Sequence, residues 1–222
     1  MHCKRLIKKS YNQGYCFPCS QTLAQCDFCI LKPETCHYHL GTCREPEWAQ
    51  THCFIPHIVY LANTSGLKVG VTRETQIPTR WIDQGAVQAL PMVRVQTRYH
   101  AGLIEVIFKK WVADKTDWRK MLKTETVKNI DLFLQRQELL NQVRVNLENL
   151  KIPLEILENQ NTTTLQYPVL EYPQKITALN VEKTPEITGI LLGIKGQYLI
   201  LDIGVLNIRN LGGYLCDFQI LT

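Results

Sequence analysis

Cysteine is distributed very unevenly along this chain of 222 residues. Eight of the nine cysteines lie within the first 53 residues, and the rest of the chain contains only Cys216. Cysteines and histidines at this density, with repeated Cys-x-x-Cys spacing, are the ligands that Zn²⁺ selects in proteins. The sequence therefore predicts that the chain begins with a module whose folding depends on a bound metal.

Four successive pairs of candidate ligands are spaced for tetrahedral zinc. They are Cys16 with Cys19, Cys26 with Cys29, Cys36 with His39, and Cys43 with Cys53. Eight ligands are enough for two closed sites, so we predict two structural zinc ions, filled either sequentially or in a cross-braced order. Two alternatives remain open: His37 or His52 replaces one ligand, or a single zinc is accompanied by spare buried thiols. A catalytic zinc is not expected, because the ligands close the sites and no His-Glu-x-x-His helix occurs.

The N-terminus and the apolar runs bear on the location of the protein. The first residues are basic and lack the apolar segment of a secretory signal, and no apolar run is long enough to span a bilayer. We therefore expect a cytoplasmic protein without a membrane partner. Thiols stay reduced in that compartment and bind metal, whereas the rival interpretation, a disulfide framework, needs an oxidising compartment.

Basic side chains are concentrated in the middle of the chain. Residues 58–128 carry 12 Lys and Arg against 6 Asp and Glu, whereas the whole chain has a net charge of only +5. A local positive excess predicts a docking region for a polyanion, either DNA or RNA. A charge excess of this size is also typical of an ordinary solvated surface.

The same region alternates between strand and helix patterns. Two runs of β-branched and aliphatic residues flank a turn at Asn63-Thr64-Ser65-Gly66, which predicts a hairpin. A proline-initiated short helix, a third strand and a strongly apolar helix follow. The expected elements are strands at 57–62, 67–72 and 89–97, and helices at 78–84 and 101–112.

These residues resemble the GIY-YIG nuclease family in their order. Tyr60, then Lys68-Val69-Gly70, then Arg80 on the following helix and Glu105 after the third strand occur where that family places its motifs. The sequence is also similar, over essentially its whole length, to a bacterial family catalogued as domain of unknown function 2797. That second likeness lies in residues 59–62, 67–70 and 80–86 and in the preceding cysteines, and it implies no activity.

The nuclease resemblance implies a divalent-metal-dependent phosphodiesterase. Glu105 would hold one Mg²⁺ or Mn²⁺, Arg80 would neutralise the scissile phosphate, and Tyr60 would orient or deprotonate the attacking water. Further phosphate or nucleic-acid contacts are expected from basic and aromatic side chains of the same region. These are Lys68, Arg73, Lys109, Trp118 and Arg119.

The chain departs from the family pattern at two motif positions. Ile58 stands where the first motif has glycine, and Lys68 stands where the second has tyrosine. A slip of one residue in the strand register would exchange Tyr60 for Val59 on the motif face. A structural interpretation is also open for Glu105, because Lys109 four residues later can form a helical ion pair with it.

The last third of the chain contains no motif that indicates catalysis or ligand binding. An amphipathic pattern predicts a long helix over 125–150, which packs on the sheet or meets a protein partner. Residues 159–164 are expected to form a polar linker. Four short strands, at 187–194, 197–202, 205–209 and 214–221, are then predicted to form a small antiparallel barrel or curled sheet.

Together these patterns predict an α+β protein in three parts. A zinc-binding module occupies residues 1–56, and a GIY-YIG-like core, with a three-stranded sheet, flanking helices and the long helix, occupies 57–152. A small antiparallel β domain occupies 165–222. The predicted function is that of an endonuclease-like hydrolase dependent on Mg²⁺ or Mn²⁺. The alternatives are a non-catalytic, zinc-dependent DNA- or RNA-binding protein and an interaction scaffold.

Overall fold

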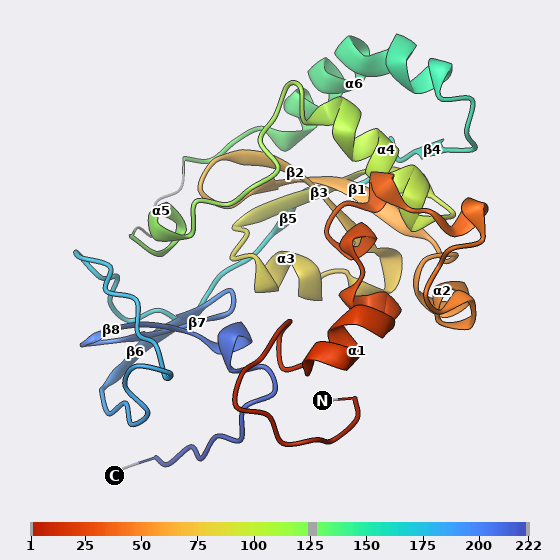
Figure 1. Cartoon of the computed structure of the whole chain (residues 1–222). Coiled ribbons are helices and arrows are strands. Elements are labelled where there is room, and N and C mark those ends of the chain that lie inside the picture. Colours follow the sequence, from red (N-terminus) through yellow and green to blue (C-terminus); the bar gives the residue numbers. More distant parts are fainter. Residues whose placement is uncertain (1, 124–127, 221–222) are drawn as a thin grey trace.

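A computed structural model describes residues 2–123 and 128–220 of the chain. An antiparallel sheet lies at its centre (Figure 1). The strands follow the order β2-β1-β3-β4, and β5 pairs with the other end of β3. Their bounds are His57–Asn63 for β1, Leu67–Arg73 for β2, Gln88–Val95 for β3, Glu155–Ile156 for β4 and Thr163–Thr164 for β5.

The predicted hairpin and third strand are confirmed. β1 pairs with β2 in an antiparallel register that places Tyr60 opposite Gly70. β3 pairs with the other edge of β1, with a register shift between Val59 and Tyr60. Every residue of β1 is buried, because it is the central strand and both faces of the sheet are covered. Its apolar residues therefore follow one another without the alternation of a half-exposed strand.

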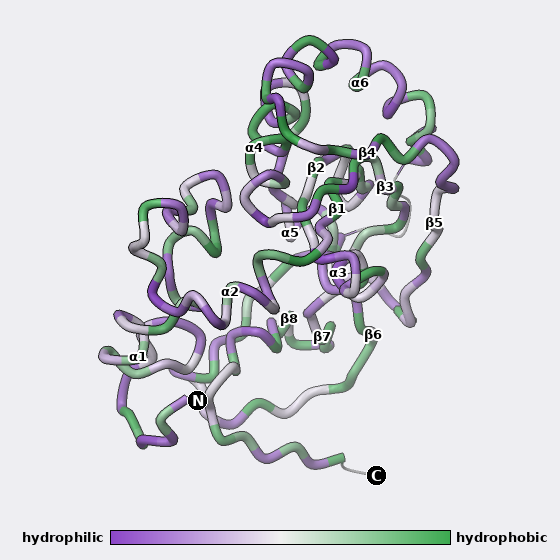
Figure 2. Tube along the Cα trace, turned by 90° about the vertical axis from the view of Figure 1, so that its right-hand side faces the viewer, coloured by the Kyte–Doolittle hydropathy of each residue, from purple (hydrophilic) through white to green (hydrophobic). Residues whose placement is uncertain are grey.

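Helices on opposite faces of the sheet create two apolar clusters. α4 (Arg98–Phe108) and α6 (Leu132–Asn149) cover the face that carries Val59 and Leu61. The short helix α3 (Thr79–Asp83) lies on the face that carries Ile58 and Tyr60, where its Trp81 is buried. Successive residues of a strand point to opposite faces, so Tyr60 faces α3 whereas its neighbours face α4. Figure 2 shows hydrophobic stretches along β1 and β3 and an alternation of hydrophobic and polar residues along α6.

The N-terminal module consists of short helices joined by tight turns. α1 (Phe17–Thr22) and α2 (Pro46–His52) flank four 3₁₀ turns, η1 (Ala24–Cys26), η2 (Phe28–Ile30), η3 (Pro33–Thr35) and η4 (Tyr38–Leu40). The module packs on α4, where η3 approaches so closely that a Cβ atom at Gly102 would lie 2.5 Å from the backbone nitrogen of Glu34. Gly102 thus permits contact between the module and the core.

The C-terminal part is an antiparallel sheet of three strands, whereas four strands in a barrel or curled sheet were predicted. Its strands are β6 (Leu191–Lys195), β7 (Tyr198–Leu201) and β8 (Gly204–Asn207), and η6 (Ile208–Leu211) follows. The strand expected at 214–221 is wrong, since residues 214–220 form no strand. The preceding Gly213 packs against the backbone of Gly14, which directs this segment along the N-terminal loop and away from the edge of β8.

A helix of the middle region belongs to the core of this C-terminal sheet. α5 (Trp118–Lys123) buries Met121 and Leu122 against Ile200 and Val205. The apolar positions of α5 therefore link the middle and the C-terminal parts. η5 (Glu74–Gln76) connects β2 with α3 on the other side of the core.

The long helix begins later than its pattern predicts. Residues 125–127 of the expected helix lie outside the described residues, and α6 begins at Leu132. There the Asp131 side chain accepts a hydrogen bond from the Leu134 nitrogen, 3.0 Å away. Before this cap, Asn63 Nδ2 donates to the Lys128 carbonyl oxygen at 2.9 Å. The backbone of 128–130 is thus tied to the end of the sheet, and it is not available for helical hydrogen bonds.

The expected linker at 159–164 also needs correction. Thr163 and Thr164 form β5 and pair with Ala89 and Gln88 of β3, and residues 155–156 form β4 at the other end of that strand. The free edge of β3 provides the hydrogen-bond partners that order this polar segment. The coarser prediction of a mixed α and β protein with antiparallel sheets is confirmed. Within the described ranges, no helix combines the length and the apolar character that crossing a membrane requires.

Candidate functional site

A cleft of about 890 Å³ lies where the three predicted parts of the chain meet. Its floor is the outer strand β2, and α3 and α4 contribute side chains from either side. Ile30, Leu31 and Pro33 of the N-terminal module form one wall, and residues 196–199 of the C-terminal sheet form another. Segments that are distant in the sequence thus create this site together.

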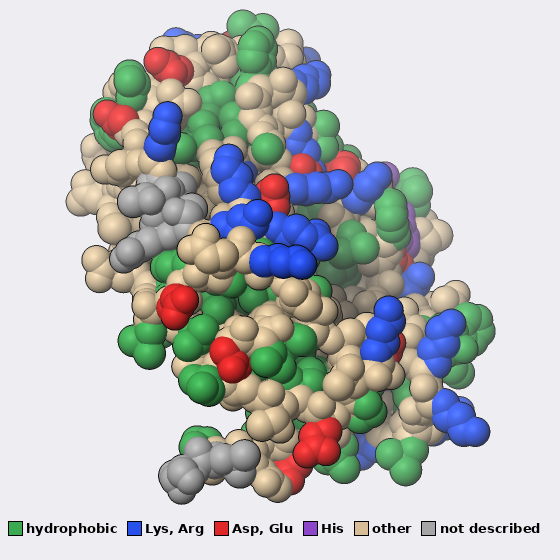
Figure 3. Space-filling view, turned by 90° about the vertical axis from the view of Figure 1, so that its left-hand side faces the viewer, with side chains coloured by type: hydrophobic (Ala, Val, Ile, Leu, Met, Phe, Trp, Pro, Cys, Tyr) green, Lys and Arg blue, Asp and Glu red, His purple; other side chains and the backbone are tan. Residues whose placement is uncertain are grey.

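Basic side chains outnumber acidic ones in the cleft. Six Lys and Arg residues line it together with three acidic residues. The basic residues are Lys68, Arg73, Arg80, Arg98, Lys109 and Arg209, and the acidic ones are Asp83, Glu105 and Asp114. In Figure 3, Lys and Arg side chains gather in the middle of one face of the molecule. A concave, positively charged surface focuses an attractive potential on polyanions.

Glu105 lies on α4 and is half of a pair of carboxylates. Its side chain is only 13% exposed, and burial raises its pKa, an effect that neighbouring Lys109 opposes. Lys109 Nζ lies 3.3 Å from Glu105 Oε2 and 3.1 Å from Asp114 Oδ2. Asp114 reaches this place because the chain after α4 runs along β2, where the Val69 nitrogen donates to the Ala113 oxygen at 2.8 Å. Two carboxylates therefore converge on a single cationic position.

Lys68 projects from β2 into the same region. Its ammonium group donates to Gln84 Oε1 at 2.9 Å and to Thr116 Oγ1 at 3.3 Å. Burial, and then the positive charge of Arg80, lower the pKa of Lys68 from 10.5 to about 8. Near neutral pH this amine therefore exchanges its proton much more readily than an exposed lysine does.

Tyr60 lies beneath the cleft, and it is not one of the described residues that line the cleft. The ring is fully buried, its hydroxyl donates to Gln84 Oε1 at 3.1 Å, and burial raises its pKa from 10.0 to about 12. A Cβ atom at Gly70 would lie 2.7 Å from the Tyr60 hydroxyl oxygen. Glycine at this cross-strand position is therefore what allows the tyrosine ring to extend under β2. Tyr60 and Lys68 meet at one atom, the side-chain oxygen of Gln84.

The remaining predicted contact residues fall into two places. Arg73 and Arg80 line the cleft. Trp118 instead stacks on Tyr198, with ring centroids 5.5 Å apart and an interplanar angle of 8°. The Arg119 guanidinium lies 4.2 Å from the centre of the Trp118 ring. Trp118 therefore joins α5 to the C-terminal sheet beside the cleft, where Tyr198 is a lining residue.

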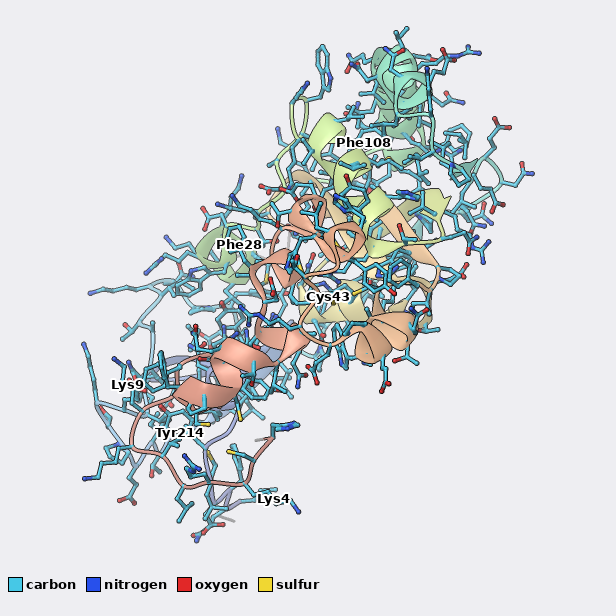
Figure 4. All side chains as sticks on the ribbon, turned by 45° about the vertical axis from the view of Figure 1, so that its right-hand side comes forward. Lys4, Lys9, Phe28, Cys43, Phe108 and Tyr214 are labelled. Carbon is cyan, nitrogen blue, oxygen red and sulfur yellow. The ribbon has the colours of Figure 1, made fainter. Side chains whose placement is uncertain are left out.

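The N-terminal module brings together side chains that could hold a metal ion. Two groups have ligand atoms within 4.8 Å of one another: Cys3 with Cys16 and Cys19, and Asp27 with Cys29 and His37. The thiol groups of Cys29, Cys36, Cys43 and Cys53 also line one small cavity with Asp27 and His37. Figure 4 shows Cys43 in the interior of the module, whereas Lys4 and Lys9 lie at its far end near Tyr214.

The remaining predicted ligands take different positions. Cys26 packs against the cluster of Cys16 and Cys19. The imidazole of His39 lies beside the ring of Tyr99, with centroids 6.1 Å apart. His39 is in neither group of converging ligands in the described part of the chain.

Several site residues were not identified from the sequence. Asp114, Gln84, Arg98 and Arg209 line the cleft, and Cys3 belongs to one of the groups that could hold a metal ion. Cys3 carried a detectable signal, because it was the one unassigned cysteine within the N-terminal cluster. No local pattern singles out the other four residues, since their partners lie in other segments of the chain.

One comparison with known proteins gives a match. A family described as "Protein of unknown function (DUF2797)" matches residues 1–216. The search of curated proteins and the search of solved structures found no match.

Proposed function

We propose that this chain, which belongs to the DUF2797 family of proteins of unknown function, is a divalent-metal-dependent phosphodiesterase that acts on nucleic acid. The observation that carries the proposal is the convergence of Arg80, Lys68 and Glu105 on one open, basic cleft. These residues are separated in the sequence and come from three elements. Their order along the chain is that of the GIY-YIG nucleases, and this likeness is part of the proposal.

The cleft has the charge and the ligands that cleavage of a phosphodiester requires. Arg80 supplies a planar, permanently charged fork for two phosphate oxygens. Arg73 and Lys68 extend the positive surface along β2. Glu105 and Asp114 provide oxygen ligands, which Mg²⁺ and Mn²⁺ prefer.

The position of Lys109 supports the fit of a divalent cation. Its ammonium group lies between the carboxylates of Glu105 and Asp114, so these residues already form a site for positive charge. Glu105 and Asp114 would hold the metal once Lys109 turns toward solvent. When bound, such an ion supplies Lewis acidity to a phosphate oxygen.

The proton of the attacking water would be taken by Lys68 instead of Tyr60. Tyr60 is buried, and its raised pKa keeps the phenol protonated at neutral pH. Lys68 lines the cleft, and with a pKa of about 8 roughly a tenth of its amine is neutral at pH 7, far more than for an exposed lysine. Tyr60 then acts as a positioning residue, because its hydroxyl and the Lys68 ammonium bond to the same oxygen of Gln84.

A nuclease assay with Glu105→Gln tests this proposal. Labelled DNA and RNA are incubated with the protein and Mg²⁺ or Mn²⁺, and both cleavage and binding are measured. We expect the substitution to lower the cleavage rate by about 100-fold or more and to retain binding, because it removes a charged metal ligand. Glu148→Gln, on the exposed side of α6, is the matched control and should cleave at the wild-type rate. Cleavage that is equal in wild type and Glu105→Gln would contradict the assignment.

A second function is favoured by the same ion pair. Lys109 already forms ion pairs with both Glu105 and Asp114, which suits a cleft that binds nucleic acid without cutting it. If nucleic-acid binding weakens steeply with salt, and neither the wild type nor Glu105→Gln cleaves the substrate, the second function is identified. Absence of both cleavage and binding would leave an interaction scaffold.

A further inference from the structure

The eight N-terminal cysteines divide into two spatial groups of four. One group surrounds the start of α1, and the other surrounds the small cavity between η2 and α2. We propose that each group forms a closed, tetrahedral four-thiolate zinc site. The first site comprises Cys3, Cys16, Cys19 and Cys26, and the second comprises Cys29, Cys36, Cys43 and Cys53. This assignment does not depend on the function proposed for the cleft.

The first group has sulfur atoms at the spacing that zinc requires. Cys3 Sγ and Cys16 Sγ are 3.6 Å apart. Tetrahedral zinc with Zn–S bonds of about 2.3 Å separates its sulfurs by about 3.8 Å, whereas a disulfide separates them by about 2.0 Å. Cys19 lies within 4.8 Å of both. The pair is thus arranged for a shared ion.

The local fold explains this arrangement. Cys16 is the residue that caps the start of α1, and Cys19 lies in its first turn, so the Cys-x-x-Cys spacing turns both thiols to the same side. Cys26 packs against the cluster that Cys16 and Cys19 form with Leu23. Its sulfur lies outside the group that Cys3, Cys16 and Cys19 form within 4.8 Å, so Cys26 would complete the closed site as its fourth thiolate by moving toward them.

The second group encloses a space suited to a single ion. Cys29, Cys36, Cys43 and Cys53 line one cavity of about 20 Å³, little more than the volume of one small sphere. The 3₁₀ turns η2, η3 and η4 reverse the chain repeatedly between Cys29 and Cys43. Cys29, Cys36 and Cys43, which follow one another at intervals of seven residues, therefore return to the same cavity, and Cys53 at the end of α2 joins them.

Asp27 and His37 are the rival ligands for this cavity. Together with Cys29 they form a group within 4.8 Å, but both make other polar contacts. Asp27 Oδ2 lies 2.7 Å from Arg44 Nε, and His37 Nδ1 lies 2.7 Å from Thr42 Oγ1. Zinc in structural sites is held most often by thiolates, with hydrogen-bonded outer groups that orient them. We assign Asp27 and His37 to this outer role.

The second site would support one wall of the cleft. The carbonyl oxygen of its ligand Cys53 accepts a hydrogen bond from the Arg98 nitrogen at 2.8 Å. Ile30, Leu31 and Pro33, between its ligands Cys29 and Cys36, line the cleft. A metal that fixes these ligands thereby fixes the position of the wall relative to α4.

Metal content and thiol reactivity of the full chain test the assignment. We expect about two zinc ions per chain by elemental analysis, and about one in either Cys3→Ser or Cys43→Ser. His39→Ala, Asp27→Asn and the control Cys216→Ser should each retain two. A wild-type content of one or none would overturn the proposal, as would loss of an ion in His39→Ala or Asp27→Asn.

Alkylation of the wild-type protein gives an independent result that needs no substitution. Cys216 is exposed, so mass spectrometry should find it modified by iodoacetamide in the native protein while the eight N-terminal thiols are protected. Removal of zinc by a strong chelator should make all nine reactive. Rapid modification of any of the eight before chelation would contradict its role as a ligand.

Replacement of zinc by Co²⁺ reports the ligand type. In the absorption spectrum, two four-thiolate sites should give sulfur-to-cobalt charge-transfer bands whose intensity corresponds to eight thiolate ligands per chain. Intensity for six or fewer would show that other ligands complete the sites. This measurement also distinguishes the zinc assignment from the nuclease proposal, because it involves neither substrate nor cleavage.

Discussion

At the scale of single residues, the environment of Lys68 predicts how the cleavage rate should depend on pH. Because its pKa is lowered to about 8, the neutral amine increases as the pH rises through 8. If Lys68 accepts the proton of the attacking water, the cleavage rate should rise with pH, reach half of its maximum near pH 8, and level off above about pH 9.

Lys68→Arg separates charge from proton transfer. Arginine keeps the positive charge but does not lose its proton in this range, so we expect nucleic-acid binding to persist while cleavage and its pH inflection disappear. The measurement is the rate of cleavage against pH at saturating substrate. An unchanged inflection near pH 8 in Lys68→Arg would assign the titration to another group.

Buried His57 gives a second prediction at this scale. Burial lowers its pKa from 6.5 to about 4, so the folded protein keeps the imidazole neutral where the unfolded chain binds a proton. The free energy of unfolding should therefore decrease as the pH falls from 6.5 toward 4, by about 3 kcal/mol for this group. Above pH 6.5 the contribution of this group should be constant.

Comparison with His57→Gln isolates the contribution of His57 from those of other titrating groups. Unfolding by urea is measured for both proteins between pH 4 and 7. The difference between their unfolding free energies should change with pH only below about 6.5, and in the direction that favours the variant at low pH. A difference that is independent of pH would show that His57 accepts its proton in the folded state.

At the scale of elements, one arginine links α6 to the chain beyond it. Arg136 is 3% exposed, and its guanidinium donates to the carbonyl oxygens of Leu157 and Glu158, both at 2.7 Å. Removing a buried charged donor leaves these acceptors unpaired. We expect Arg136→Met to lower the free energy of unfolding by about 2–4 kcal/mol.

The same helix contains the matched control. Arg144 forms an exposed ion pair with Glu148, and its side chain is 76% exposed. Arg144→Met should change the free energy of unfolding by less than about 1 kcal/mol. Equal effects of the two substitutions in denaturant titrations would contradict the proposed link.

The packing of α6 also bears on its expected role as a docking element. Its apolar positions, among them Leu139, Val143 and Leu147, are buried in the main core. The apolar side of α6, which the sequence assigned either to the core or to a protein partner, therefore packs against the sheet. Exposed apolar residues such as Val145 remain on the opposite side, and a protein partner stays an untested prediction.

At the scale of the whole molecule, the cleft depends on contacts among three parts of the chain. Arg209 follows the C-terminal sheet and Arg80 lies on α3, yet both line the same cleft. If nucleic acid occupies it, each arginine that contacts a phosphate releases counterions. Substitution of either by glutamine should reduce the slope of log affinity against log salt by about 0.7–0.9.

Binding titrations at several salt concentrations check this prediction. Arg144→Gln, on α6 and outside the described lining of the cleft, should retain the wild-type slope. A reduced slope in Arg80→Gln together with a wild-type slope in Arg209→Gln would exclude the C-terminal sheet from the binding surface.

The local elements of this protein were predictable because their determinants are close together in the sequence. The β1–β2 hairpin follows from two β-branched runs around a four-residue turn, and α4 from an unbroken apolar helical pattern. The start of α6 also had a local signal, the capping residue Asp131, which a strict reading of the apolar periodicity overlooked.

Local patterns were enough to predict the central hairpin, its flanking helices and candidate metal ligands in the N-terminal module, because each depends on residues within a few turns of one another. Folding of the whole chain brings distant groups together: Cys3 beside Cys16, Asp114 and Glu105 on one lysine, and Arg209 and Arg80 in one cleft. Such meetings arise from packing of apolar faces and from strand pairing between remote segments. No spacing within one segment encodes them.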